Sequence, residues 1–202
     1  MSDFDKAVGT LEECIELIGD EIQDTLEHPD NAGKTVGFIV EHSGWVYTVE
    51  GNPSVGPRFI VQFPFNILDS FEELLDEEDA EEILDDPSQY SSEETVPSMA
   101  LEILKTIPHH QMEQFRYHLI DQISTTDAAY SLMTEDKVVY GFRVSRDVFP
   151  LDDGYNLTEF SHTAQTVVSS GLSGVKFVNK AFNFEDLVEN ELGDSENQRY
   201  IH

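Results

Sequence analysis

Residues 36–50, VGFIVEHSGWVYTVE, decide the fold. Apolar side chains alternate with other residues on both sides of the dipeptide Ser43-Gly44, and this period of two is typical of β-strands that bury one face. The alternating apolar positions are Val36, Phe38 and Val40 before the dipeptide and Trp45, Tyr47 and Val49 after it. The stretch therefore predicts a β-hairpin that turns at Ser43-Gly44.

Three further strands follow from the same pattern. After the turn-rich residues 51–57, a strand is expected from Arg58 to Phe63 or Phe65, and Pro64, which lacks an amide donor, marks a strand end or a sheet edge. A second hairpin is expected to pair residues 130–133 with residues 138–145, turning at 134–137. The sequence thus predicts five strands.

Helical periodicity predicts the remaining elements. Apolar residues at steps of three and four predict an amphipathic helix over 8–27, ending near Pro29, with a loop over 29–33. A second helical region spans 98–124, where Pro108 should kink or divide it. A long helix over 157–181 carries Gly171 and Gly174 at its middle, which implies close packing or a break.

These elements predict an α+β protein with an antiparallel five-stranded sheet, helices packed on one side, and the order α-βββ-α-ββ-α. At 202 residues we expect a single domain over 1–202. It would include an acidic insert or linker at 68–97 and a polar C-terminal tail at 186–202. Residues 68–96 hold 13 acids and no base.

The charge of the chain excludes two classes of target. It has 41 Asp and Glu against 11 Lys and Arg, for a net charge of −30. Binding to nucleic acid and to anionic lipid draws on bases, so neither is an expected partner. The acids are spread along the whole chain, which favours adaptation to high salt, where the Debye length falls to about 3 Å. The alternative is an acidic adaptor protein from a low-salt cell.

Cysteine usage and hydropathy indicate the compartment. The lone Cys14 permits no intramolecular disulfide, and we expect it to be a small buried apolar residue. The chain has no basic, apolar leader and no apolar run of the ~18 residues that a membrane span needs. We therefore expect a soluble, cytoplasmic protein.

The order of elements, with the hydrophobic patterns quoted above, resembles the type III secretion chaperone-like superfamily, including its bacterial and archaeal relatives outside secretion. The resemblance covers residues 8–66 and 98–183. It implies a small acidic homodimer that presents apolar grooves to a partner polypeptide and catalyses no reaction. It rests on element order, so it assigns no functional residue.

The leading hypothesis is accordingly a chaperone- or adaptor-like module that binds a protein or peptide and uses no cofactor. Aromatic side chains dominate interface energetics, so the predicted partner-binding residues are Trp45, Tyr47, Phe63 and Phe65, with ordinary core as the alternative for each. No catalytic residue is predicted, because no nucleophile or phosphate-binding motif occurs. Competing hypotheses are a structural component of a larger assembly and a carboxylate- or metal-dependent hydrolase.

Three other clusters have a plain and a functional interpretation. The acidic run at 76–86 is interpreted as solvated charge rather than a Ca²⁺ or Mg²⁺ site. The histidines His109, His110 and His118 are interpreted as exposed or capping residues rather than metal ligands. A group of bases suggests a patch for an acidic segment, such as the protein's own insert; it comprises Lys137, Arg143 and Arg146, joined by Lys176 and Lys180.

Overall fold

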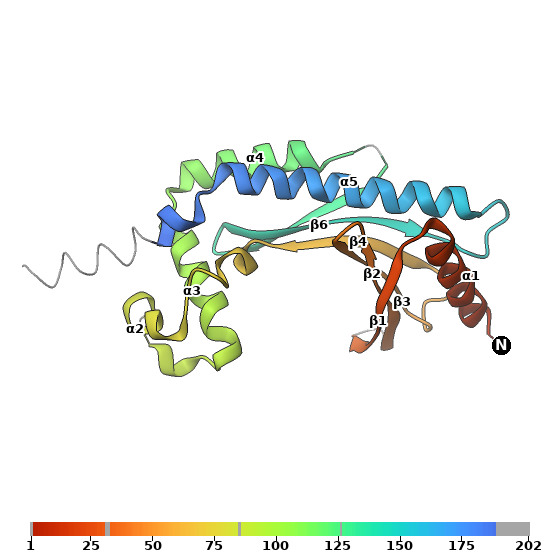
Figure 1. The fold of residues 1–202 in the computed structure, drawn as a ribbon, viewed down its shortest axis with the longest axis horizontal. Coiled ribbons are helices and arrows are strands. Elements are labelled where there is room, and N and C mark those ends of the chain that lie inside the picture. Colours follow the sequence, from red (N-terminus) through yellow and green to blue (C-terminus); the bar gives the residue numbers. More distant parts are fainter. Residues whose placement is uncertain (1, 31–32, 85, 126, 189–202) are drawn as a thin grey trace, which may run out of the picture. The chain divides into compact units, whose positions relative to one another are not determined.

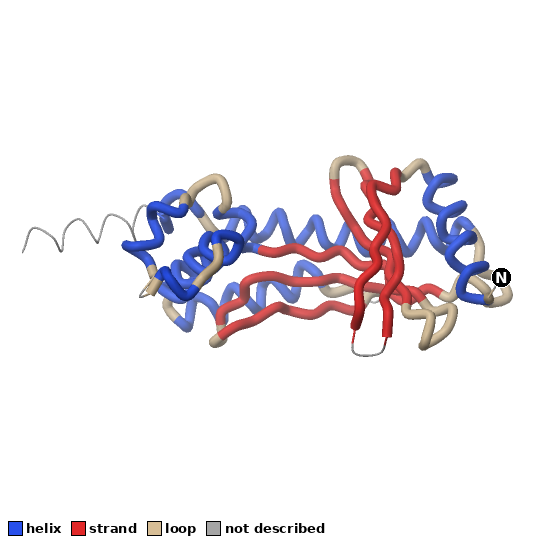
Figure 2. The backbone as a smooth tube through the Cα atoms, turned by 90° about the horizontal axis from the view of Figure 1, so that it is seen from below, coloured by secondary structure: helices blue, strands red, loops and turns tan. Residues whose placement is uncertain are grey.

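The computed structural model describes residues 2–30, 33–84, 86–125 and 127–188. Its six strands form one antiparallel sheet in the order β1-β2-β3-β4-β6-β5 (Figure 2). They are β1 (Glu21–Asp30), β2 (Gly33–His42), β3 (Trp45–Gly51), β4 (Phe59–Asn66), β5 (Ala129–Glu135) and β6 (Val138–Val148). The α+β class is confirmed, and the predicted count of five strands is wrong by one.

The helices give the order α-ββββ-αα-ββ-α when single-turn elements are left aside (Figure 1). The long ones are α1 (Asp3–Ile18), α3 (Ser92–Thr106), α4 (His109–Ile123) and α5 (Leu157–Ala181). Pro108 divides α3 from α4, and α5 has its predicted bounds. The second helical region begins at Ser92, six residues before the predicted start at 98.

The prediction of one helix over 8–27 is wrong, because α1 ends at Ile18. Gly19 adopts a left-handed conformation with φ of 85° and donates its N–H to the carbonyl of Glu16. The next N–H, of Asp20, reaches back to the carbonyl of Ile15. These two bonds form a Schellman motif, which satisfies the last carbonyls of the helix and turns the chain away.

The residues after this turn form the sixth strand. β1 lies at one edge of the sheet and pairs antiparallel with β2. Its register shifts at Gln23, between Ile22 and Asp24, which is the mark of a β-bulge. Ile22 and Leu26, four residues apart, fit a helical stripe in the sequence, yet both are only half-buried in the strand.

The predicted hairpin turn at Ser43-Gly44 is confirmed. β2 and β3 pair in a register that places His42 opposite Trp45, and the two residues between them both have positive φ, 53° and 83°. This is the geometry of the two-residue turn whose twist matches that of the strands. The second hairpin uses the same device, with positive φ at Asp136 and Lys137.

The fold groups into two compact units. Unit 1 contains Met1–Pro64, Ile123–Ser131 and Arg143–Ser173. In its core the ring of Phe4 on α1 stacks on Phe59 of β4, with 4.9 Å between centroids. Gly171 of α5 lies against Phe63 of the same strand. Phe59 and Phe63 share a face of β4, so α1 and α5 pack on that face.

Unit 2 contains Phe65–Gln122, Leu132–Phe142 and Gly174–His202. α4 lies beside the C-terminal part of α5, where Phe115 stacks on Phe177 at 5.5 Å (Figure 1). Much of the predicted insert packs here: it forms the short elements η1 (Ile67–Phe71), η2 (Glu77–Asp79), α2 (Ala80–Ile83) and η3 (Pro87–Gln89), and it buries Leu68, Phe71, Leu75, Ala80 and Leu84.

The start of the predicted polar tail also packs in unit 2. Val188 is buried, and Leu187 donates its N–H to the carbonyl of Asn183. The rest of that segment, 189–202, lies outside the described residues. Among the helices that the structure describes, none has both the length and the apolar character needed to cross a membrane.

Candidate functional site

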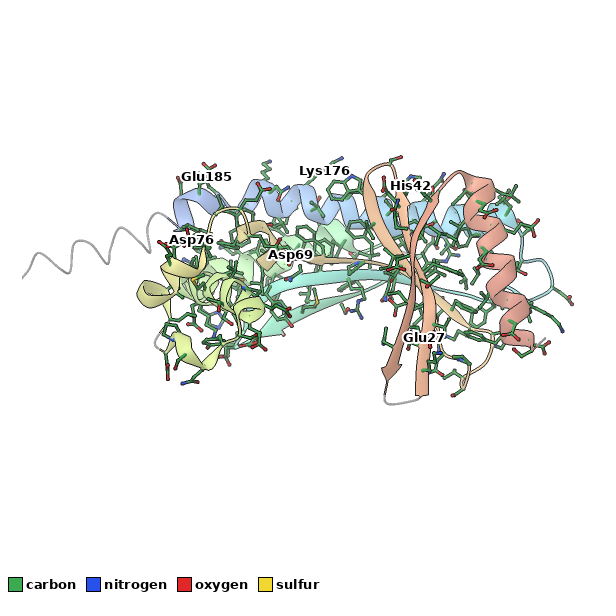
Figure 3. The ribbon with its side chains drawn as sticks, turned by 60° about the horizontal axis from the view of Figure 1, so that its bottom comes forward. Glu27, His42, Asp69, Asp76, Lys176 and Glu185 are labelled. Carbon is green, nitrogen blue, oxygen red and sulfur yellow. The ribbon has the colours of Figure 1, made fainter. Side chains whose placement is uncertain are left out.

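Unit 1 contains a surface groove of about 620 Å³ between the tip of the β2–β3 hairpin and α5. We call it the Trp45 groove. Its hairpin side is formed by His42, Ser43 and Trp45, and its helix side by His162, Gln165, Thr166, Val168, Ser169 and Leu172. His42 stands at the end of β2, beside α5 (Figure 3).

Local sequence explains both walls of the groove. The two-residue turn at Ser43-Gly44 leaves the hairpin ends His42 and Trp45 facing each other across the tip. On α5 the lining residues recur mostly at steps of three and four, so they form one stripe of the helix surface. The groove is thus formed by the tip of one hairpin and one face of a helix, both of them regular elements.

Gly171 sets how closely α5 approaches the sheet. A Cβ atom at this position would lie 2.3 Å from Cδ1 of Phe63, far inside van der Waals contact. The ring of Phe63 in turn meets the indole of Trp45, with 6.3 Å between centroids. The close-packing interpretation of this glycine is therefore correct, and the same packing supports the indole from below.

The structure separates the four predicted partner-binding residues. Trp45 is 39% exposed and lines the groove, whereas Tyr47 is fully buried and Phe63 is 2% exposed. Phe65 belongs to unit 2, where its ring packs on Phe142 at 5.4 Å. The prediction thus finds one surface aromatic, Trp45, together with Phe63, the core ring that supports it.

A buried carboxylate holds His42 in place. The side chain of Asp20 is 3% exposed and accepts hydrogen bonds from Nδ1 of His42 (2.6 Å) and from the hydroxyl of Tyr47 (2.8 Å). Burial and the bond to Asp20 raise the pKa of Tyr47 well above its usual range. Because Nδ1 is engaged, Nε2 is the ring nitrogen of His42 that is left for a ligand in the groove.

Sequence reasoning missed Asp20 and His42. The two residues are 22 positions apart, and they meet because the chain leaves α1 at Gly19 and enters β1. An interpretation that extends the helix to residue 27 puts Asp20 on a helix surface instead. The signal that was available is Gly19, a typical residue just beyond a helix end.

A second pair of side chains borders the groove from β6 and α5. Arg146 donates a hydrogen bond from Nη1 to Nδ1 of His162, over 3.2 Å. A guanidinium group has five N–H donors, so this bond leaves most of them unused. Arg146 makes no ion pair with any carboxylate in the part of the chain that the structure describes.

Arg146 belongs to a distinct set of bases. Five Lys and Arg residues form ion pairs with described carboxylates: Lys6, Lys34, Arg58, Lys105 and Arg116. The other five in the described ranges form none, and they are Lys137, Arg143, Arg146, Lys176 and Lys180. These are the same five bases that the sequence groups together.

The lining of the Trp45 groove contains no Asp or Glu among its nine residues. The whole chain has 41 acids in 202 residues, about one in five. The helix that forms one wall, α5, has a single acid, Glu159, in its 25 residues. The groove is therefore a neutral to basic site on a strongly acidic protein.

The groove has donors and an aromatic surface, but it does not assemble a nucleophile. Its serines are Ser43 and Ser169, and the Ser169 hydroxyl donates to the carbonyl of Thr166 over 3.3 Å. Neither serine is hydrogen-bonded to His42 among the described contacts. Nucleophilic catalysis uses such a contact between nucleophile and base, and the described contacts of these two serines do not provide it.

The predicted histidine face of α4 lines a cavity of about 690 Å³ in unit 2. His110, Gln114 and His118 share that lining, and His109 lies outside it. In the described ranges, no group of three or more His, Cys, Asp or Glu residues is placed to hold a metal ion, and this includes the described part of the acidic run at 76–86. A zinc site needs at least three protein ligands.

A second cavity of unit 2, of about 530 Å³, is acidic. Its carboxylates are Asp69, Glu72, Glu73 and Glu185, two of which are labelled in Figure 3. Burial and the neighbouring Glu72 raise the pKa of Asp69, while a hydrogen bond from Asn66 opposes the rise. Several acids therefore meet in this cavity, and one of them, Asp69, has a raised pKa.

Comparison with known proteins gives a similarity of fold. No protein-family model matches the chain, and no curated protein matches it. A crystal structure of an uncharacterized protein from Methanothermobacter thermautotrophicus is similar, with a TM-score of 0.55 and 10% sequence identity. The alignment covers 88% of this chain and 99% of that one. The chain thus shares its α+β architecture with an archaeal protein.

Proposed function

We propose that this protein is a non-enzymatic, chaperone- or adaptor-like module that holds a polypeptide segment of a partner protein in the Trp45 groove. The observation that carries the proposal is Trp45 itself. Its indole is 39% exposed, rests on the buried ring of Phe63, and opens onto a groove whose lining has no carboxylate.

The size and chemistry of the groove support this function. Pockets that hold a ligand typically measure about 300–1,000 Å³ and combine apolar surface with a few polar groups. Here Trp45, Val168 and Leu172 supply apolar surface, and His42 and Gln165 supply polar groups. Tryptophan is also among the residue types that are enriched at the binding hot spots of protein interfaces.

The resemblance to the secretion chaperone-like superfamily points the same way, since its members present apolar surface to partner polypeptides. The proposal includes the homodimer, the adaptation to high salt and the cytoplasmic location. Light scattering at molar KCl tests the dimer, because it should give twice the chain mass of 22.9 kDa. A single-chain mass would contradict the dimer and leave the groove unaffected.

Site-specific photo-crosslinking tests the function. A photoreactive side chain at Gln165 faces the Trp45 groove, and the same side chain at Glu12 on α1 serves as the matched exposed control. In a lysate of the source cells at molar KCl, we expect a discrete polypeptide to couple at 165, to be absent at 12, and to be lost when Trp45→Ala is added. Equal coupling at both positions, or none at 165, would contradict the proposal.

The hydrolase alternative is supported by the acidic cavity with the raised pKa of Asp69. The hydrolase and the binding hypotheses make opposite predictions about the effect of Asp69→Asn. If a reaction occurs there, Asp69→Asn should abolish turnover of activated esters and leave crosslinking at 165 unchanged. If the binding function is correct, the protein turns over no such ester and Asp69→Asn has no effect.

A further inference from the structure

We propose that the segment bound in the Trp45 groove is acidic: an apolar side chain flanked by Asp or Glu, whose carboxylates meet Arg146, His162 and His42. This inference rests on the proposed function and adds the chemical class of the partner. It follows from three features of the groove, namely the acids it lacks, the donors it offers and the anchor it provides.

The first feature is the absence of repulsion. An acidic segment that approaches this protein elsewhere meets a chain in which about one residue in five is an acid. The nine residues lining the Trp45 groove include none. Like charges in contact disfavour association, so an acidic segment has a selective reason to settle at this site.

The second feature is a set of unused donors. Arg58 makes two N–H bonds to Oδ1 and one to Oδ2 of Asp147, so its guanidinium is already paired with one of the protein's own carboxylates. Arg146 has no described carboxylate and touches His162 of the groove lining instead. An arginine binds a carboxylate through paired N–H bonds, and Arg146 has the donors left for that geometry.

The opposite wall of the groove offers another donor. Asp20 accepts a hydrogen bond from Nδ1 of His42 and is itself almost fully buried, at 3% exposure. A carboxylate in that position fixes the orientation of the ring and engages Nδ1. A doubly protonated imidazole donates from both of its nitrogens, and in that form Nε2 of His42 can hold a second carboxylate of the bound segment.

The third feature is the apolar anchor. Trp45 and Leu172 face the groove from opposite walls, with Val168 buried beneath the helix side. This surface fits an aliphatic or aromatic side chain placed between the two donor sets. A basic segment fits poorly, because a lysine or arginine would meet His42 and Arg146 with no acid in the lining to receive it.

Peptide selection on the intact protein tests the inference. A library of random short peptides, depleted on the Trp45→Ala protein, is selected on the wild-type protein at molar KCl. We expect the retained peptides to carry Asp and Glu around an aliphatic or aromatic residue. Trp45→Phe serves as the second depletion variant if circular dichroism shows that Trp45→Ala does not fold.

A synthetic peptide from the selection then gives the energetics. Trp45 is the only tryptophan of the chain, so its fluorescence reports binding directly. We expect the version with every Asp and Glu changed to its amide to bind about tenfold more weakly, or worse, and Arg146→Gln to weaken the acidic peptide by a similar factor. Arg116→Gln, which alters an exposed ion pair on α4, is the matched control and should change nothing.

The outcomes separate the two proposals. If peptides are retained without enrichment in acids, or if the amide version binds as well as the acidic one, the acidic partner is wrong and the binding function stands. If Arg146→Gln leaves binding of the acidic peptide unchanged, the assigned contact is wrong. If no peptide distinguishes wild type from the tryptophan variants, the proposed function itself is overturned.

Discussion

Helices α1 and α5 pack on the same face of β4, yet they show solvent very different surfaces. Seven residues of α1 are exposed, and five of them are acids: Asp3, Asp5, Glu12, Glu13 and Glu16. Ten residues of α5 are exposed, and Glu159 is the one acid among them. The protein has a net charge of −30, and the face of α5, with its single exposed acid, is where we propose that a partner binds.

The largest effect that would test this comparison is steric. Gly171→Ala on α5 puts a methyl group 2.3 Å from the Phe63 ring, and we expect the free energy of unfolding to fall by about 2–3 kcal/mol. Gly9→Ala on α1 meets nothing within 4 Å, so it should raise that free energy by about 0.5–1 kcal/mol. Urea unfolding in molar KCl measures both, and two changes of the same sign would break the comparison.

The next effect lies where α1 ends. Asp20→Asn weakens the bonds to His42 and Tyr47 inside unit 1, and we expect a loss of about 1–3 kcal/mol in the free energy of unfolding. Lys6→Gln on the same helix breaks an exposed ion pair with Asp3, which should cost less than about 0.5 kcal/mol. Equal losses in urea unfolding would show that the buried carboxylate has no special role.

Alkaline pH tests a residue on which both helices act. Burial, then the Cys14 thiol of α1 and Glu159 of α5, raise the pKa of Tyr155; burial and Asp20 raise that of Tyr47. The unfolded phenols ionise near pH 10 while the folded ones stay protonated. The two tyrosines should therefore leave stability unchanged below about pH 10 and lower it above that pH, by about 1.4 kcal/mol per pH unit for each tyrosine.

Single substitutions assign this alkaline slope. The Tyr155 hydroxyl is buried and has no hydrogen-bond partner among the described residues, so Tyr155→Phe should fold and should reduce the slope by one tyrosine's share, about 1.4 kcal/mol per pH unit. Tyr117→Phe, at a residue that is 70% exposed, should leave the slope intact. An unchanged slope in the Tyr155 variant, measured by urea unfolding on both sides of pH 10, would contradict the assignment.

The smallest expected effect is the loosening of α1 at low salt, which is measured as the reactivity of the Cys14 thiol. Burial raises the pKa of Cys14, so the thiol should resist alkylation at high KCl. As KCl is lowered, repulsion among the exposed acids of α1 should loosen that helix first. The comparison is a thiol at the buried position Ala164 of α5, introduced as Ala164→Cys in a protein that also carries Cys14→Ser. As KCl is lowered, Cys14 should become reactive at a higher KCl concentration than the thiol at position 164. Reaction of both thiols at one KCl concentration would oppose this order.

The parts of the fold that the sequence predicts are those with an unambiguous period. The Ser43-Gly44 hairpin and α5 carry periods of two and of three to four over enough residues to exclude other structures. Residues 21–27 do not, because Ile22 and Leu26 continue the stripe of α1 although the strand leaves both half-buried. The glycine that stops the helix outweighs the hydrophobic pattern there.

The candidate site was predictable only at Trp45, for a related reason. Alternation places Trp45 and Tyr47 on one face of β3, and it marks both as core. Trp45 lies at the end of the hairpin, at the edge of that core, where α5 forms the other wall of the groove. The groove therefore depends on packing between segments that are far apart in the sequence, which alternation within one strand does not reveal. The contact between Asp20 and His42 depends on the chain entering β1 after Gly19. Because β1 was not predicted from the sequence, this contact could not be predicted either.

The edge position of β1 also restricts how this protein can associate. The strand exposes Glu21, Asp24 and Glu27, and its bulge at Gln23 interrupts the regular ladder. Charges and a bulge on an edge strand discourage another chain from adding to the sheet, which is the first step of fibre growth. A partner polypeptide should therefore not bind by adding a strand to β1. Recognition of a partner on that side of the sheet would depend on side chains.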